Sequence, residues 1–261
     1  MNQSIKCTAC RNGKAFDVPI TMAFQPIVSI STGQVFAYEA LVRGLDERGA
    51  VLIFEAVSDQ TIYAFDQKCR VTAIEWADRL GVADTGALLS INFLPNAVYN
   101  PTACIQLTLE AAERTGFPVD QIMFEFTESE RIDTIHLLGI LEAYRDLGFH
   151  TAIDDFGAGY AGLDLLARFQ PDIVKLDMEL IRDIDTHPAK FAILRHLTNM
   201  MHELNVRVIC EGIETTDEAL ALMDCGIDLM QGFLFAQPAF QSLPQVTEFD
   251  IAAAQRAGFA G

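Results

Sequence analysis

The sequence predicts an α/β fold, a modified TIM or (β/α)8 barrel whose first strand runs antiparallel to the second. The chain has 261 residues, a typical length for one such barrel. Segments rich in β-branched residues alternate with helical stretches, as they do in a mostly parallel sheet. The connection around Thr32-Gly33-Gln34 is too short for a parallel crossover, which needs about a dozen residues, so the first two strands should be antiparallel.

Eight segments rich in apolar and β-branched residues are the predicted strands. In chain order they are Thr21–Ser29, Val35–Arg43, Leu88–Phe93, Ile122–Thr127, His150–Asp155, Ile173–Leu176, Arg207–Glu211 and Leu229–Phe233. In a closed barrel, the C-terminal ends of the parallel strands gather at one rim, and the functional sites of such barrels lie there.

Helices are predicted between most of these strands, because apolar residues recur there with a period near 3.6. One series is Phe191, Leu194, Leu197, Met201 and Leu204, and another is Leu137, Leu141 and Tyr144. Two helix starts carry capping signals. Asn100-Pro101 places a cap before a first-turn proline, and Thr215-Thr216-Asp217-Glu218 matches a capping box.

Composition and charge limit the class of protein. Hydrophobic residues make up 51% of the chain, enough for a large core, and the formal net charge is −18. No stretch reaches the roughly 18 consecutive apolar residues of a membrane helix, and the start lacks the pattern of a secretory signal. A cytoplasmic protein with no membrane partner is therefore expected. The negative charge argues against a nucleic acid polymer as partner, although bound cations would allow a phosphate ester to bind.

Three segments are expected along the chain. A short, loosely ordered N-terminal segment covers residues 1–18, the barrel covers residues 19–250, and a C-terminal tail covers residues 251–261. Cys7 and Cys10 form a C-x-x-C pair in the first segment. An unligated tail is favoured, since termini are loosely held and no second pair completes a zinc site. Half a zinc site and a redox pair are left open, as is whether the chain stands alone, is a fragment or is regulated by a partner.

Each of the seven predicted strands after the first carries a polar residue, mostly at or near its C-terminal end. These residues are Glu39, Asn92, Glu125, Asp154 with Asp155, Lys175, Glu211 and Gln231. Strands buried on both faces are normally almost continuously apolar, and a buried charge is costly unless it is paired or bound to a metal. One such residue could be an exposed strand end or a structural ion pair. All seven positions together predict a cluster at one rim.

The five carboxylates of this cluster are not expected to gather without cations. Oxygen ligands suit Mg²⁺ or Mn²⁺ better than Zn²⁺. Asp154 and Asp155 are adjacent at a strand end, where both side chains can turn toward the rim and one can bridge two ions. Two metal ions about 3.5–4 Å apart activate a water and hold a phosphoryl group.

Eight short motifs follow one another along the chain. They are Gln25-Pro26-Ile27-Val28, Tyr38-Glu39-Ala40-Leu41-Val42-Arg43, the single residue Asn92, Glu125-Phe126-Thr127-Glu128, Asp154-Asp155-Phe156-Gly157-Ala158-Gly159-Tyr160, Lys175-Leu176-Asp177, Glu211-Gly212-Ile213-Glu214 and Gln231-Gly232-Phe233. Together they resemble the EAL family of cyclic-di-GMP phosphodiesterases over roughly Met22 to Pro238. Each motif alone is weak evidence for this resemblance, and the ordered set is strong evidence.

The resemblance implies a hydrolase of bacterial second-messenger signalling. Such an enzyme converts cyclic di-GMP to linear pGpG with a water activated by two metal ions, Mg²⁺ or Mn²⁺. The implied ligands are Glu39, Asn92, Glu125 and Asp154 for one ion, and Asp154, Asp155 and Glu211 for the other. The implied catalytic residues are Glu39, Asp155, Lys175 and Glu211, with Lys175 beside the attacking water as a proton partner or an electrostatic anchor.

The resemblance also implies substrate contacts from Gln25, Arg43 and Gln231, support of the loop after the fifth strand by Glu128 and Glu214, and a homodimer. The sequence departs from the family pattern at Ala158 and at Ala161-Gly162, which leaves regulation open, and at Gly44, which follows Arg43 where tryptophan is frequent. Two alternatives stay open. One is a catalytically inactive cyclic-di-GMP receptor or protein-interaction module, and the other is a barrel enzyme that acts on a different phosphate ester.

Overall fold

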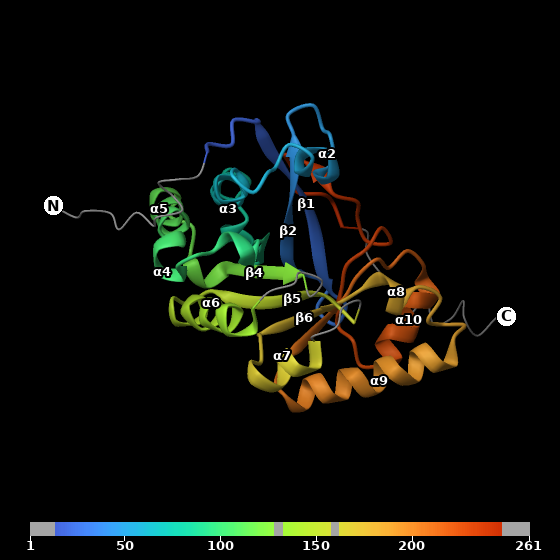
Figure 1. Ribbon diagram of the computed structural model, residues 1–261. Helices are drawn as coiled ribbons and strands as arrows, with labels where there is room; N and C mark the ends of the chain where they lie inside the picture. The colour runs from blue at the N-terminus through green and yellow to red at the C-terminus, as the bar shows by residue number, and fades with distance from the viewer. Residues whose placement is uncertain (1–13, 128–132, 158–161, 247–261) are drawn as a thin grey trace.

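A computed structural model describes residues 14–127, 133–157 and 162–246 of the chain (Figure 1). Cys7, Cys10 and Glu128 lie outside the described residues, as do Ala158 and Ala161. In the part of the chain that is described, no helix is long and apolar enough to cross a membrane.

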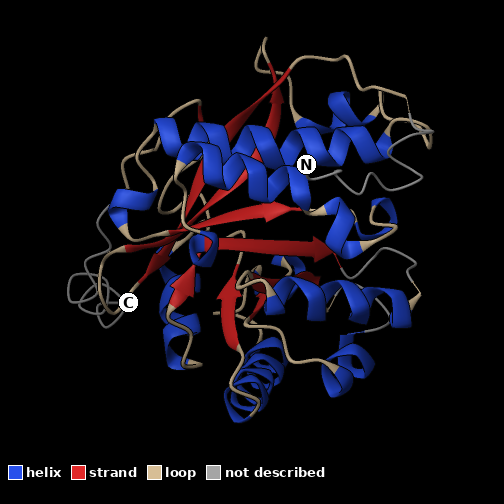
Figure 2. Ribbon diagram, turned by 90° about the vertical axis from the view of Figure 1, so that its left-hand side faces the viewer, coloured by secondary structure: helices blue, strands red, loops and turns tan. Residues whose placement is uncertain are grey.

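Eight of the described strands form one closed barrel with helices around it, and a ninth pairs with the first (Figures 1 and 2). The strands are β1 (Ile20–Ser29), β2 (Val35–Gly44), β3 (Leu88–Asn92), β4 (Ile122–Thr127), β5 (His150–Phe156), β6 (Ile173–Leu176), β7 (Arg207–Cys210), β8 (Leu229–Met230) and β9 (Ala239–Phe240). Neighbours from β2 to β8 pair in parallel, and β1 closes the barrel by pairing antiparallel to both β2 and β8. The predicted fold class is therefore confirmed.

Six predicted strand bounds differ from the structure. β1 begins at Ile20, β2 ends at Gly44 and β3 ends at Asn92, each one residue away from its predicted bound. β7 ends at Cys210 and β8 ends at Met230, so Glu211 and Gln231 each lie one residue beyond a strand. Beyond these ends, the two loops bond to each other through the backbone of Ile213. The Ile213 N–H donates to the Gln231 carbonyl, and the Leu234 N–H donates to the Ile213 carbonyl. These bonds replace the regular ladder. β5 is instead one residue longer than predicted and includes Phe156.

The described helices are α2 (Ala50–Phe54), α3 (Ile62–Arg79), α4 (Pro101–Cys104), α5 (Gln106–Thr115), α6 (Thr134–Asp146), α7 (Gly162–Arg168), α8 (Met178–Ile181), α9 (Pro188–Glu203) and α10 (Thr216–Asp224). Both predicted caps are present. The Asn100 side chain accepts a hydrogen bond from the Ala103 N–H, and Thr215 and Glu218 form the capping box of α10. The predicted series Leu137, Leu141 and Tyr144 lies on α6. The series from Phe191 to Met201 lies on α9, and its last member, Leu204, is the residue that follows this helix.

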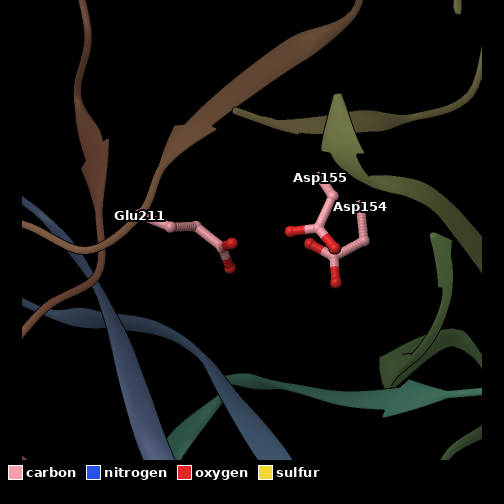
Figure 3. A group of neighbouring side chains, drawn as sticks. All are labelled: Asp154, Asp155 and Glu211. Atoms are coloured by element: carbon pink, nitrogen blue, oxygen red, sulfur yellow. The ribbon is translucent and has the colours of Figure 1, made fainter. Parts of the chain in front are cut away.

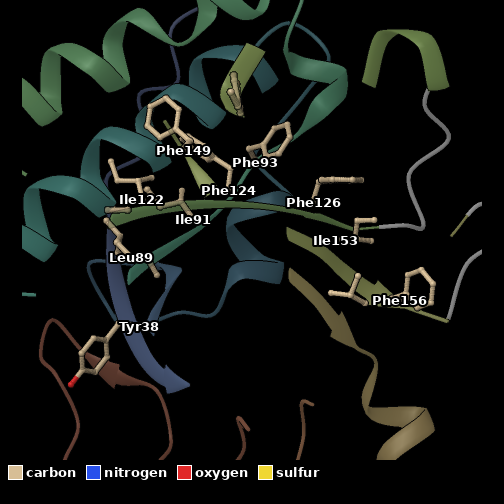
Figure 4. Packing of buried hydrophobic residues seen from close by; sticks show 14 of the residues in the cluster. Tyr38, Leu89, Ile91, Phe93, Ile122, Phe124, Phe126, Phe149, Ile153 and Phe156 are labelled. Carbon is tan, nitrogen blue, oxygen red and sulfur yellow. The ribbon is translucent and has the colours of Figure 1, made fainter. Parts of the chain in front are cut away.

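Aromatic side chains fill the space between the sheet and the helices on one side of the barrel (Figure 4). Phe93, Phe124 and Tyr144 pack edge to face or tilted, with ring centroids 5.0–5.9 Å apart. The guanidinium of Arg70 is buried among these three rings and pairs with Asp66 at 2.7 Å. This cluster fixes α3 and α6 against β3 and β4.

The lower barrel interior is closed by one apolar side chain from each of the eight barrel strands. These residues are Ile27, Ala37, Leu88, Met123, Ala152, Ile173, Ile209 and Leu229. Side chains two positions apart on a strand point to the same face. On β2, for example, Ala37 is followed two positions later by Glu39. On the other parallel strands the same step leads to a polar layer above the apolar one, toward the C-terminal rim. On the antiparallel β1 the corresponding residue is Gln25, two positions before Ile27 and opposite Glu39.

Candidate active site

The polar layer surrounds the ammonium group of Lys175 on β6, a side chain that is fully buried. Four carboxylates lie around its Nζ. Glu211 is the nearest at 2.7 Å, Glu125 and Asp154 are each at 3.2 Å, and Glu39 is at 3.6 Å. The barrel thus brings together charges that are up to 172 positions apart in the chain, as predicted from their strand-end placement.

Glu39 is held by two side-chain amides, one at the end of β3 and one just after β8. Asn92 Nδ2 donates to Glu39 Oε1 at 3.1 Å, and Gln231 Nε2 donates to Glu39 Oε2 at 2.7 Å. Gln25, which lies opposite Glu39 on β1, accepts a hydrogen bond from Gln231 at 3.3 Å. Both oxygens of this carboxylate therefore have a fixed direction.

Ser90 is a member of the layer that the sequence reasoning missed. It lies on β3 between Leu88 and Asn92, on the face that points into the barrel, and it is fully buried. Its hydroxyl donates a hydrogen bond to Glu125 Oε2, and Asn92 Nδ2 donates to Glu125 Oε1 at 2.8 Å. The alternation Leu88–Ser90–Asn92 was a sequence signal for it. Serine carries no charge, however, so its place in an apolar strand is less unusual than that of a glutamate or a lysine.

Asp154 and Asp155 turn toward the same rim because the end of β5 is irregular. The pairing of β5 with β6 shifts between Ile153 and Phe156, and Asp155 has a positive φ of 53°. A non-glycine residue in this left-handed region is uncommon and is typical of functional sites. Figure 3 shows both carboxylates directed toward Glu211, and one oxygen from each of the three lies within 4.8 Å of the others.

Burial and mutual repulsion act on three of these carboxyl groups. Burial, together with the charge of Asp154, raises the pKa of Glu211 to about 8 and that of Asp155 to about 6. Burial also holds the pKa of Glu125 well above its ordinary value. The set therefore resists full ionisation, although the charge of Lys175 opposes each of these shifts.

The balance differs at Glu39 and Lys175. Burial raises the pKa of Glu39, but the charge of Lys175 and the hydrogen bond from Gln231 outweigh burial, so the pKa is lowered. Burial lowers the pKa of Lys175, but the charges of Asp154 and Glu125 outweigh it, and the pKa is raised well above its ordinary value. The ammonium form is thus held among the carboxylates.

The residues fit bound divalent cations. Four carboxylates lie within 3.6 Å of the Lys175 ammonium and Asp155 lies beside Asp154, so five carboxylates share the charge of this lysine. The three close oxygens of Asp154, Asp155 and Glu211 are within the span of ligands around one ion, and an all-oxygen set suits Mg²⁺, Mn²⁺ or Ca²⁺.

A pocket of about 320 Å³ opens above this group and is lined in part by Gln25, Glu39, Asp154, Asp155, Glu211 and Gln231. Asp177, which the sequence reasoning gave no role, also lines it. Its charge contributes to the raised pKa of Asp155, and its side chain caps α8 through the Glu179 N–H at 2.8 Å. Its position two residues after Lys175, at the end of a strand, was the sequence signal that could have placed Asp177 at the site.

Two predicted residues have partners different from those expected. Arg43 is half buried, and its Nη1 donates to the Val42 carbonyl at 2.8 Å; it is not among the described residues that line the pocket. Glu214 lines the pocket, and its carboxylate pairs with Arg182, just beyond α8, at 2.9 Å. The loop that Glu214 was expected to support lies partly outside the described residues.

Comparison with known proteins gives a family match over most of the chain. The model of the EAL domain matches residues 17–238. A standalone versatile EAL protein from Vibrio cholerae O395, in its c-di-GMP-bound form, is 50% identical, with a TM-score of 0.86 over 89% of this chain and 98% of that one. BlrP1 of Klebsiella pneumoniae, in a complex with manganese and cyclic di-GMP, is 34% identical, with a TM-score of 0.83 over 90% of this chain and 60% of that one.

Two curated relatives from Escherichia coli K12 carry names of different kinds. The blue light- and temperature-regulated antirepressor BluF is 32% identical over 225 residues, which are 86% of this chain and 55% of BluF. The cyclic di-GMP phosphodiesterase PdeR is 32% identical over 229 residues, which are 84% of this chain and 34% of PdeR. The chain thus spans between about a third and about half of the length of these relatives.

Proposed function

The chain belongs to the EAL domain family, and on that premise we propose that it hydrolyses cyclic di-GMP to linear pGpG. The observation that carries the proposal is the meeting of Glu39, Glu125, Asp154, Asp155 and Glu211 around Lys175 at the C-terminal rim. A relative named as a cyclic di-GMP phosphodiesterase and a related structure with manganese and cyclic di-GMP support it. We assign residues 19–250 to this catalytic barrel.

We assign two cation positions to the layer. Glu39, Asn92, Glu125 and Asp154 would hold one ion, and Asp154, Asp155 and Glu211 would hold the other. Mg²⁺ and Mn²⁺ both suit these oxygen ligands. When bound, such ions would lower the pKa of a water molecule and neutralise the charge that develops on the phosphoryl oxygens.

The chain's own residues supply position and electrostatics for this reaction. Asn92 and Gln231 fix the two oxygens of Glu39, and Ser90 fixes Glu125. Lys175 keeps its proton on Nζ among four carboxylates, which favours its role as an electrostatic anchor over that of a base.

Gln25 and Gln231 lie at the pocket wall, where their amides would contact the substrate. Arg43 donates one N–H of Nη1 to the Val42 carbonyl, and its guanidinium carries further N–H donors that would contact a substrate phosphate. Homodimerisation is proposed on the family resemblance alone.

The test is a hydrolysis assay of cyclic di-GMP with Mg²⁺, with Mn²⁺ and with a chelator, in which pGpG is followed by chromatography. We expect product with either metal and none with the chelator. Absence of product under all metal conditions would exclude the proposed activity. A panel of other phosphate esters in the same assay separates cyclic di-GMP from rival substrates.

A second candidate function is a receptor or protein-interaction module without catalysis. It is favoured by the relative BluF, which is named as an antirepressor. Binding of cyclic di-GMP without formation of pGpG in the presence of Mg²⁺ or Mn²⁺ would select this function. The complete set of costly buried carboxylates favours catalysis, because a receptor does not need them.

A further inference from the structure

Two apolar side chains are exposed in a pocket that is otherwise dominated by carboxylates. Met178, the first residue of α8, is 44% exposed, and Phe233, in the turn after β8, is 57% exposed. Both line the same pocket as Asp154, Asp155 and Glu211. Single exposed apolar residues are common on protein surfaces. Two of them at the wall of one acidic pocket call for a different explanation.

The backbone holds both residues against the loop that follows β7. Gly212 in this loop approaches Met178 so closely that an added Cβ would lie 2.6 Å from Met178 Cβ. On the other side of the loop, a Cβ added to Gly232 would lie 2.0 Å from the Ile213 carbonyl oxygen. Met178 and Phe233 therefore flank the segment Gly212–Ile213 from two directions, on backbone that is tightly packed.

The core does not require either side chain in its exposed position. Phe235, two residues after Phe233, is 1% exposed, and it belongs to the same hydrophobic core cluster as the fully buried Ile213. Met178 follows Asp177, whose side chain caps α8 and already fixes this end of the helix. The outer parts of Phe233 and Met178 thus remain available to a ligand in the pocket.

We propose that Met178 and Phe233 form a base platform, which binds the flat face of a purine in the dinucleotide substrate. The proposal rests on the proposed function. It assigns a binding surface to the base, the part of the substrate that the carboxylates do not bind. Stacking of a base on an aromatic ring is favourable for any base, and a methionine side chain adapts its shape to an aromatic partner. The base platform selects phosphodiesters that carry a base beside the bond to be broken.

The test measures equilibrium binding of cyclic di-GMP, by dialysis in Ca²⁺ buffer, to the unaltered chain and to variants. Phe233→Ala should raise the Kd by about tenfold, as expected for loss of one base–aromatic stack. Phe233→Trp, which keeps a stacking ring, should stay within about threefold of the unaltered chain. Met178→Ala keeps the Cβ that packs on Gly212 and should also raise the Kd.

Tyr99→Ala is the control, since Tyr99 is 65% exposed outside the pocket lining and its loss should leave the Kd unchanged.

Thermal unfolding of each variant shows whether it is folded. If Phe233→Ala does not fold, Phe233→Leu keeps apolar bulk without a ring and is expected to show the same rise in Kd. An unchanged Kd in the folded variant overturns the base platform, whether or not the chain hydrolyses cyclic di-GMP. Binding without hydrolysis by the unaltered chain in Mg²⁺ or Mn²⁺ buffer overturns the phosphodiesterase alone, and in that case the rise in Kd still supports the base platform.

Discussion

At the scale of single residues, Glu39 is the carboxylate whose two oxygens are both fixed by neighbouring amides. Replacing it with alanine removes a proposed metal ligand and leaves the Asn92 and Gln231 amides at the pocket edge, where water can reach them. We therefore expect Glu39→Ala to lower kcat for cyclic di-GMP by at least about a hundredfold, with the fold retained.

Steady-state kinetics and circular dichroism check this expectation. Glu142→Ala is a matched control, because Glu142 is an exposed glutamate on α6 that does not line the pocket. Hydrolysis by Glu39→Ala at the rate of the unaltered chain would show that the metal site is placed wrongly.

Ser90 acts one contact further from the proposed ions, through its hydrogen bond to Glu125. Partners that orient metal ligands typically change metal affinity by about 10–100-fold when they are removed. Ser90→Ala should therefore raise the Mn²⁺ concentration needed for half-maximal activity by about tenfold, while activity at saturating Mn²⁺ recovers. A titration with Mn²⁺ measures both quantities. An unshifted titration curve would mean that Ser90 only fills space.

At the scale of elements, the loops after β7 and β8 pack closely against each other and so position the rim residues that follow these strands. Gly232 after β8 lies against the backbone of Ile213 after β7, and a Cβ at position 232 would meet the Ile213 carbonyl oxygen at 2.0 Å and its nitrogen at 2.3 Å. Backbone atoms cannot move aside as a flexible side chain can. The turn that carries Gln231 therefore depends on glycine at this position.

Gly232→Ala is expected to lower the free energy of unfolding by about 1–3 kcal/mol or more, as overpacking does, and to reduce hydrolysis as well. Gly139→Ala is the matched control. Gly139 lies exposed within α6 with nothing within 4 Å of an added Cβ, so alanine should raise stability by about 0.5–1 kcal/mol. Urea unfolding measures both changes. Equal effects of the two substitutions would argue against close packing of the loops.

At the scale of the whole molecule, the chain has a formal net charge of −18, and part of this negative charge is concentrated at the rim. Cations that bind the folded rim should stabilise the fold by mass action. At a free metal concentration of about 100 times Kd, the gain is about 2.7 kcal/mol, which corresponds to a rise in Tm of roughly 5–10 °C for a chain of this size.

Thermal unfolding with Mn²⁺ or Mg²⁺, and with EDTA, measures this shift. K⁺ at equal ionic strength controls for general screening of the acidic surface. Asp155→Asn should lose most of the metal-dependent rise and keep the response to K⁺. Equal shifts from K⁺ and Mn²⁺ would mean that no specific site contributes to the stability.

The sequence by itself determined the barrel and most of its polar rim. A charge in an apolar strand such as that of Glu39, Glu125 or Lys175 is costly, so its occurrence at one strand end after another could be recognised without coordinates. The antiparallel start followed from the length of the connection between the first two strands, because the turn before Val35 is too short for a crossover.

Only the tertiary structure decided which atoms meet. Lys175 lies within 3.6 Å of four carboxylates from four other strands or strand ends, and Ser90 reaches Glu125 across a strand pair. The positive φ of Asp155 accompanies the shifted pairing of β5 with β6, and the contact of Gly232 with Ile213 joins two loops. The physical reason is that hydrogen bonds and charge interactions act over a few ångströms, and the distance between residues far apart in the chain is set by barrel closure and not by local sequence pattern.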